Sequence, residues 1–201
     1  MLIPGPQAQT EAIRALTEIR AVVDRTTRYS TFSALSGFLA GVAALIGSGG
    51  CGHYRDFPGA RADDWSFVYV WSGVFAFAAF QLGLLTALKA RQRGEAVWTP
   101  IARTAFKALL GPALAGMMGS LVFCVASDFH LLAGLWLLLY GCGLWAVSFF
   151  APMFLRWMSL AFMFLGMIAW AVKENPGLWL GLGFGGLHLF FALVVLTRYR
   201  K

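Results

Sequence analysis

The fold is decided by the stretch LLAGLWLLLYGCGLWAVSFFAPMFLRWMSLAFMFLGMIAWAV, residues 131–172. Its 42 residues contain a single charged side chain, Arg156, and a single proline, Pro152, which divides the stretch into two apolar runs. Each run has about 20 residues, the length that an α-helix needs to cross a bilayer. Neither run alternates apolar and polar residues, as the strands of a membrane barrel do. The stretch therefore predicts two consecutive membrane-spanning helices joined by a tight turn.

Four further apolar runs lie on either side of this stretch. The six predicted spans are 32–50, 66–88, 108–127, 131–151, 153–172 and 178–197. Of the 201 residues, 59% are hydrophobic and 12% charged, whereas soluble domains have about 45–50% apolar and about 25% charged residues. This composition excludes an ordinary soluble protein, a disordered chain and a nucleic-acid-binding domain. We expect an all-α fold, in which residues 30–201 form an integral membrane bundle of six transmembrane helices.

The basic residues predict how the bundle is oriented. With six spans, 13 of the 16 Lys and Arg residues lie on the side of the two termini, and only Arg55, Arg61 and Lys173 lie on the other side. Cytoplasmic loops carry such an excess of basic residues. We therefore expect both termini in the cytoplasm, with the net charge of +7 suited to an anionic inner leaflet.

Residues 1–29 are predicted to be a cytoplasmic lead that contains an amphipathic helix over 10–28. Its apolar residues follow the helical period and its charged residues fall on the opposite side. Two interpretations remain open: the helix anchors the chain at the membrane surface, or it docks a partner protein.

Small residues recur at helical spacing in three of the predicted spans. They are Gly37 and Gly41 in the first, Gly111 and Gly119 in the third, and Gly177, Gly181 and Gly185 at the sixth. Such rows let two helix backbones approach closely. We expect these glycines to be helix-packing residues, either inside one chain or between copies.

His188 is the one ionisable residue expected near the middle of the bilayer, where such groups are costly and often functional. Because residues 181, 185 and 188 are spaced by four and three, an α-helix would place His188 on the face of Gly181 and Gly185, and Gly183 elsewhere. The imidazole could bond to a neighbouring helix, or contact haem, quinone or a pigment, or relay protons. A second axial ligand for haem is not offered by the other histidines, His53 and His130, which are expected at the outer surface. Methionine could ligate as well, at Met117, Met118, Met163 or Met167, but in a span it is more often a packing residue.

A set of imidazoles and carboxylates is expected at the outer face. It comprises His53, Asp56, Asp63, Asp64, Asp128 and His130. These groups suit Zn²⁺ or another divalent ion, but no HxxxH or HExxH spacing supports a metal site, so a solvated acidic loop is the preferred interpretation. Cys51 and Cys124 also lie toward this side, and their spacing leaves open whether they pair.

The N-terminal quarter of the chain carries a resemblance. Its residues are Glu18-Ile19-Arg20, Arg25-Thr26-Thr27-Arg28, Leu35-Ser36-Gly37, Ala40-Gly41 and Ala44-Leu45-Ile46-Gly47. This segment resembles the start of an uncharacterised family of bacterial inner-membrane proteins, in which an amphipathic helix leads into a small-residue first span. The resemblance implies a multi-pass protein of the bacterial inner (cytoplasmic) membrane and brings no activity or catalytic residues.

The sequence contains no complete catalytic motif and no soluble domain. We therefore expect a non-enzymatic integral membrane protein, a small structural or accessory subunit that packs against other membrane proteins, for example those of an energy-converting complex. The alternatives are a small transporter or channel, and a redox subunit that contacts haem or quinone through His188. The expected partners are the lipid bilayer and other membrane subunits or a second copy of the chain, but not nucleic acid.

Overall fold

The structure, a computed structural model, describes residues 34–53, 65–94, 96–151, 153–172 and 175–198, together with Glu11, Arg14 and Leu16. For 50–53, 93, 101, 150 and 198 it describes the backbone alone. Within this part of the chain every regular element is helical, which confirms the all-α prediction. Glu11, Arg14 and Leu16 are helical, and the other residues of the amphipathic segment 10–28 lie outside the described residues.

The regular elements that the structure describes between residues 34 and 198 are all helical. They are α2 (Ala34–His53), α3 (Trp65–Arg93), α4 (Pro100–Val125), the 3₁₀ turn η2 (Phe129–Leu131), α5 (Leu132–Val147), the 3₁₀ turn η3 (Ser148–Phe150), α6 (Phe154–Val172), α7 (Pro176–Leu180), η4 (Gly181–Leu187) and α8 (His188–Arg198). The last three form one continuous helix whose middle part, η4, is wound as a π-helix. We refer to α7, η4 and α8 together as the last helix.

Five helices of the described chain are long and apolar enough to cross a membrane: Trp65–Gln92, Ala102–Val125, Phe129–Val147, Phe154–Val172 and Pro176–Thr197. They correspond to the last five predicted spans. The first predicted span, 32–50, corresponds to α2, whose apolar part Ala34–Gly49 is shorter. The protein is thus a helical bundle with the helix lengths of a multi-pass membrane protein.

Capping explains why α4 begins before the apolar run that the sequence marks. The hydroxyl oxygen of Thr99 accepts a hydrogen bond of 3.2 Å from the backbone N–H of Ala102, and Pro100 occupies the first turn. Proline suits this position because its missing N–H would have no partner there. The helix therefore carries Arg103 and Lys107 on its first turns, at the end of its apolar part.

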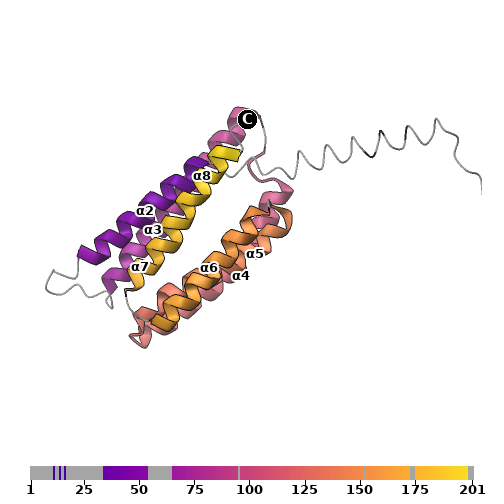
Figure 1. Cartoon of the computed structure of the whole chain (residues 1–201). Coiled ribbons are helices and arrows are strands. Elements are labelled where there is room, and N and C mark those ends of the chain that lie inside the picture. Colours follow the sequence, from indigo (N-terminus) through magenta and orange to yellow (C-terminus); the bar gives the residue numbers. More distant parts are fainter. Residues whose placement is uncertain are drawn as a thin grey trace, which may run out of the picture.

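The helices form two groups of three, which lie beside each other in Figure 1. In the first group, α2 packs against α3 and along the whole last helix. In the second group, α5 packs between α4 and α6. The groups meet where α7 contacts α5 and α6, so the last helix lies at the seam between them.

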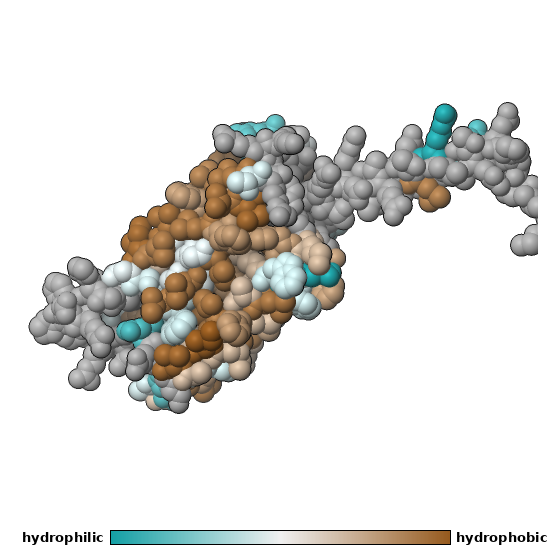
Figure 2. Space-filling view, in the orientation of Figure 1, coloured by the Kyte–Doolittle hydropathy of each residue, from teal (hydrophilic) through white to brown (hydrophobic). Residues whose placement is uncertain are grey.

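The most deeply buried side chains belong to α5 and α6. Leu137 and Phe162 are fully buried, and so is Ser159, whose hydroxyl donates to the carbonyl of Arg156 within its own helix. The outer surface is different, because Figure 2 shows mainly hydrophobic side chains over the described helices. An apolar exterior on a helical bundle is what a lipid environment requires.

Candidate functional site

Glycines of both helices form the contact between α2 and the last helix. A Cβ on Gly41 would lie 3.0 Å from the carbonyl oxygen of Gly185, and one on Gly37 would lie 3.4 Å from the carbonyl oxygen of His188. Two turns further along α2, the Ser48 hydroxyl donates a hydrogen bond of 2.8 Å to the carbonyl of Gly177. The structure thus brings together two of the glycine rows that the sequence indicates, from the first and the sixth span.

The other two glycines of this set complete the contact. Gly181 faces the side chain of Ser48, and Gly185 faces Leu45, whose Cδ2 would lie 2.6 Å from an added Cβ. No side chain larger than hydrogen fits at either position without displacement of its neighbour. We call this contact between α2 and the last helix the glycine seam, formed by Gly37, Gly41, Gly177, Gly181 and Gly185.

His188 does not share the face of the glycine seam, and this prediction was wrong. Its side chain points away from α2 toward Tyr140 of α5. The cause is the π-helical winding of η4, which turns less per residue than an α-helix, so that residues three apart no longer lie on one face. Gly183 points away from the face of Gly181 and Gly185, as predicted, and is buried against Leu137 and Phe162.

Tyr140 and His188 are joined by a hydrogen bond of 3.0 Å between the phenol oxygen and the imidazole Nε2. The bond links α5 of the second group to the last helix of the first group. The other ring nitrogen, Nδ1, is buried and has no hydrogen-bond partner among the described residues. Nδ1 interacts electrostatically with the backbone of Phe184, four residues earlier, but the two groups do not have the geometry of a hydrogen bond.

Two phenylalanines enclose this pair. Phe162 lies edge-on to Tyr140, with ring centroids 4.8 Å apart, and Phe184 stacks on His188 with centroids 6.1 Å apart. Phe184 also contacts Tyr140 at 5.0 Å and Phe162 at 5.4 Å. The rings of Phe162 and Phe184 therefore lie beside the hydrogen bond between Tyr140 and His188. Their apolar surfaces strengthen the bond and offer no competing polar group. We call Tyr140, Phe162, Phe184 and His188 the aromatic cluster.

The aromatic cluster does not fit haem. The ring nitrogen Nε2 of His188 is engaged by Tyr140, and the rings of Phe162 and Phe184 lie against the imidazole, with centroids 5.7 Å and 6.1 Å away. What the cluster offers chemically is one hydrogen bond between two neutral groups, with Nδ1 as a spare polar atom. This arrangement favours a positional role for His188 over ligation of a cofactor.

The glycines predicted for the third span fall into two kinds. Gly119 faces Leu135 of α5, whose Cδ2 would lie 2.9 Å from an added Cβ. Gly111 faces open space, with nothing within 4 Å, so it makes no packing contact inside the described chain, and its role in a contact with another chain stays a prediction. The physical reason is that α4 touches the bundle along one side only, and Gly111 lies on the other.

The tightest helix contact involves residues that the sequence interpretation missed. A Cβ on Gly166 of α6 would lie 3.0 Å from the carbonyl oxygen of Gly134, and one on Gly141 of α5 would lie 2.9 Å from the carbonyl oxygen of Ser159. The available signal was the spacing of seven in both helices, from 134 to 141 and from 159 to 166. That spacing places small residues on one face two turns apart.

The predicted outer-face metal site is only partly within the structure. Asp128 and His130 are described and half-buried, whereas the side chains of His53, Asp56, Asp63 and Asp64 lie outside the described residues. Among the residues that are described, no three His, Cys, Asp or Glu side chains are grouped closely enough to hold a metal ion. Cys124 is buried as a free thiol, so the structure does not contain the Cys51–Cys124 disulfide that the sequence left open.

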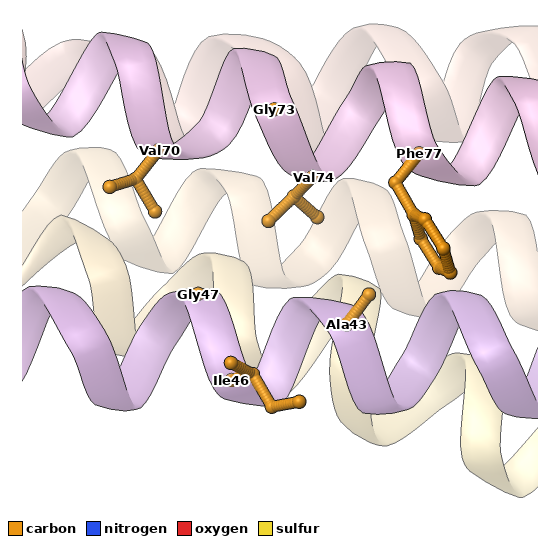
Figure 3. A pocket seen from close by; sticks show the side chains of 7 residues that line it. All are labelled: Ala43, Ile46, Gly47, Val70, Gly73, Val74 and Phe77. Carbon is orange, nitrogen blue, oxygen red and sulfur yellow. The ribbon is translucent and has the colours of Figure 1, made fainter.

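An apolar groove of about 430 Å³ runs between α2 and α3. Figure 3 shows its lining, which is entirely hydrocarbon: Ala43, Ile46, Gly47, Val70, Gly73, Val74 and Phe77. The groove is open along one side and carries no polar group that would orient a ligand. It lies away from the aromatic cluster and is the kind of surface that acyl chains cover.

Comparisons with known proteins place no further constraint on the site: no family model matches the chain, and neither a curated protein nor a solved structure does.

Proposed function

We propose that this protein is a multi-pass membrane protein of six spans that acts by association, as an accessory subunit docked against another membrane protein. Both termini are cytoplasmic in this proposal, and the membrane is the inner membrane of a bacterium. The length of α2 supports a count of six spans, with α2 as the first. Its 20 residues correspond to about 30 Å, the thickness of the hydrocarbon core.

The observation that carries the proposal is the unequal burial of the helices. Only 6% of the apolar segment of α3 and 11% of that of α4 is buried in the bundle, against 33–44% for the three later spans. A helix held by so little of its surface gains little from the packing of its own chain. Two such helices leave most of their surface free for contacts outside the chain.

The exposed face of α4 has features of a surface for another helix. Gly111 has nothing within 4 Å, and Ala115, one turn later, is exposed as well. Two small residues four apart allow a second helix to approach the backbone closely. Large side chains lie beyond them on the same face, at Met118 and Val122, which are 71% and 63% exposed. We therefore assign the face of Gly111, Ala115, Met118 and Val122 to a transmembrane helix of a partner subunit.

Site-specific photocrosslinking in native membranes tests this assignment. A photoreactive amino acid at Met118 is expected to give a discrete adduct with another protein. The matched control is Phe164 of α6, which is 66% exposed and lies on a helix that is already well packed. Gly111→Leu should abolish the adduct from Met118, because the leucine side chain fills the position of the approaching helix.

Three outcomes would contradict the proposal. Adducts to lipid alone from both positions would mean that α4 faces the bilayer. Adducts between two copies of the chain would identify a homo-oligomer. Equal adducts from Met118 and Phe164 would show that crosslinking reports crowding instead of a defined surface.

A further inference from the structure

Arg156 lies in the first turn of α6 and has no carboxylate partner within the described part of the chain. Glu11 and Asp128 carry the only carboxylate side chains among the described residues. Asp128 directly precedes η2, which lies at the other end of the second helix group from the start of α6. A charge that is partly buried among apolar helices is costly when nothing neutralises it. The guanidinium of Arg156 therefore favours the approach of an anion.

The Arg156 side chain is oriented by Phe149, the middle residue of η3. Its Cζ atom lies 5.3 Å from the centroid of the Phe149 ring, a distance typical of a cation–π contact. The Nε atom is enclosed and has no hydrogen-bond partner among the described residues, whereas the terminal Nη atoms are not enclosed in this way. The guanidinium therefore presents its Nη atoms outward. Two parallel N–H donors of this kind match the oxygens of a phosphate.

The surroundings of Arg156 are apolar and face outward. Phe149, Met153 and Trp157 are exposed, and Trp145 of α5 packs edge-on against Phe149 with ring centroids 6.0 Å apart. A phosphate at the Nη atoms would therefore lie beside exposed hydrocarbon and aromatic surfaces. Exposed tryptophans at the end of a membrane helix are typical of the interface between acyl chains and headgroups. The ligand that fits such a surface joins an anionic group to apolar chains.

The end of the bundle at which Arg156 lies also carries other basic residues. The helices α4 and α5 are antiparallel, and Leu109 in the first half of α4 lies against Gly143 near the end of α5. The start of α4, with Arg103 and Lys107, therefore lies at the same end as the turn between α5 and α6. In the topology proposed above this end faces the cytoplasm, where the inner leaflet contains anionic lipids.

We propose that Arg156 and Phe149 form a binding site for the phosphate group of an anionic phospholipid in the inner leaflet. The Nη atoms of Arg156 donate to the phosphate oxygens, and the acyl chains lie along Trp145, Phe149 and Trp157. The site is separate from the face of α4 assigned to a partner helix, because α5 lies between α4 and α6. The inference rests on the proposed function only for the side of the membrane, so the purified chain tests it without a partner.

Lipid titration of the purified protein in a neutral detergent tests the site. The probe is phosphatidylglycerol, and the comparisons are phosphatidylcholine with the same acyl chains and inorganic phosphate. A ligand that binds the folded protein raises its unfolding temperature. Phosphatidylglycerol should raise this temperature to a plateau, whereas both comparisons at matched concentrations should raise it less. If either comparison is as effective as phosphatidylglycerol, the site does not select an anionic lipid and the proposal fails.

Arg156→Gln removes the charge and keeps a polar side chain. It should raise the phosphatidylglycerol concentration needed for half of the shift by about tenfold or more, because hydrogen bonds to a charged group are lost. The matched control, Arg103→Gln, removes the same charge from an exposed position on α4 and should change that concentration less than about twofold. An equal change in both variants would mean that lipid binding depends only on overall charge. That result, or no change in the Arg156 variant, would overturn the site.

Phe149→Ala tests the second half of the site and keeps the proposal testable if the Arg156 variant does not fold. The ring is exposed, so its removal leaves the core of the bundle in place. Without the ring the guanidinium loses its fixed orientation, and the half-saturating phosphatidylglycerol concentration should rise. Phe80→Ala removes a similarly exposed ring from α3 and should leave that concentration unchanged. Unchanged lipid affinity in the Phe149 variant would contradict the proposal.

Discussion

A Cβ atom on Gly41 would lie 3.0 Å from the carbonyl oxygen of Gly185, so α2 and the last helix meet at backbone distance. A backbone oxygen cannot move aside as the end of a flexible side chain can. The two helices therefore depend on the absence of a side chain at residue 41, and this dependence can be measured.

Gly41→Ala should destabilise the protein by about 1–3 kcal/mol, the usual cost of overpacking. The matched control is Gly83→Ala in α3, where nothing lies within 4 Å. The control should be neutral or stabilising by up to about 1 kcal/mol, because alanine favours the helix. Equilibrium unfolding of the purified protein in mixed detergent micelles measures both. Equal stability of the two variants would show that the α2 contact is not maintained in the membrane protein.

Gly166→Ala should likewise weaken the contact between α5 and α6. Its Cβ would lie 2.9 Å from the backbone nitrogen of Leu138 and 3.0 Å from the carbonyl oxygen of Gly134. We expect a loss of about 1–3 kcal/mol by the same overpacking mechanism. Gly111→Ala, at a position with nothing within 4 Å, is the comparison and should cost nothing in the isolated protein. Loss of stability in the Gly111 variant alone would mean that Gly111, and not Gly166, lies at a tight helix contact.

The Tyr140–His188 hydrogen bond should appear as a coupling free energy. Tyr140→Phe and His188→Leu each remove one partner, and the double variant removes both, which isolates the pair. Intramembrane hydrogen bonds measured in this way average about 0.6 kcal/mol and reach about 1.7 kcal/mol. We expect a coupling in that range, obtained from the unfolding of the four proteins in the double-mutant cycle. A coupling of zero would mean that the two side chains do not interact.

The orientation of the chain is predicted by its basic residues. A fluorescent protein fused after Lys201 should fluoresce, because it folds in the cytoplasm, whereas alkaline phosphatase at the same position should be inactive. The opposite pattern is expected for fusions in the segment 54–64, between α2 and α3. Active phosphatase at residue 201 would require an odd number of spans or a reversed orientation, and would contradict the charge argument.

Several features followed from the sequence because they depend on one property at a time. Apolar length predicted the five later spans, which correspond to the five long apolar helices of the described chain. The glycine rows predicted that Gly41 and Gly185 belong to closely packed helices. A single sequence does not show which helix faces which. The row that contains Gly111 therefore looked the same as the rows of Gly41 and Gly185, although Gly111 faces outward.

The aromatic cluster shows more clearly what could not be predicted from the sequence. His188 was recognised because an ionisable residue in a membrane span is conspicuous. Its hydrogen-bond partner, Tyr140, lies 48 residues earlier, and no spacing rule links the two positions. The contact between Gly134 and Gly166 was missed for a similar reason. Its spacing of seven is regular, but regular spacing does not identify the partner helix.

By itself, the sequence determined that this chain is an all-helical protein built for an apolar surrounding, because the transfer of a residue into lipid depends on that residue and its near neighbours. Only the tertiary structure decided how the helices divide into two groups and which way His188 faces. The winding of η4 is the physical reason. Its glycines lie against Ser48 and Leu45 of α2 on one side and against Leu137 of α5 and Phe162 of α6 on the other, and these neighbours are far apart in the sequence.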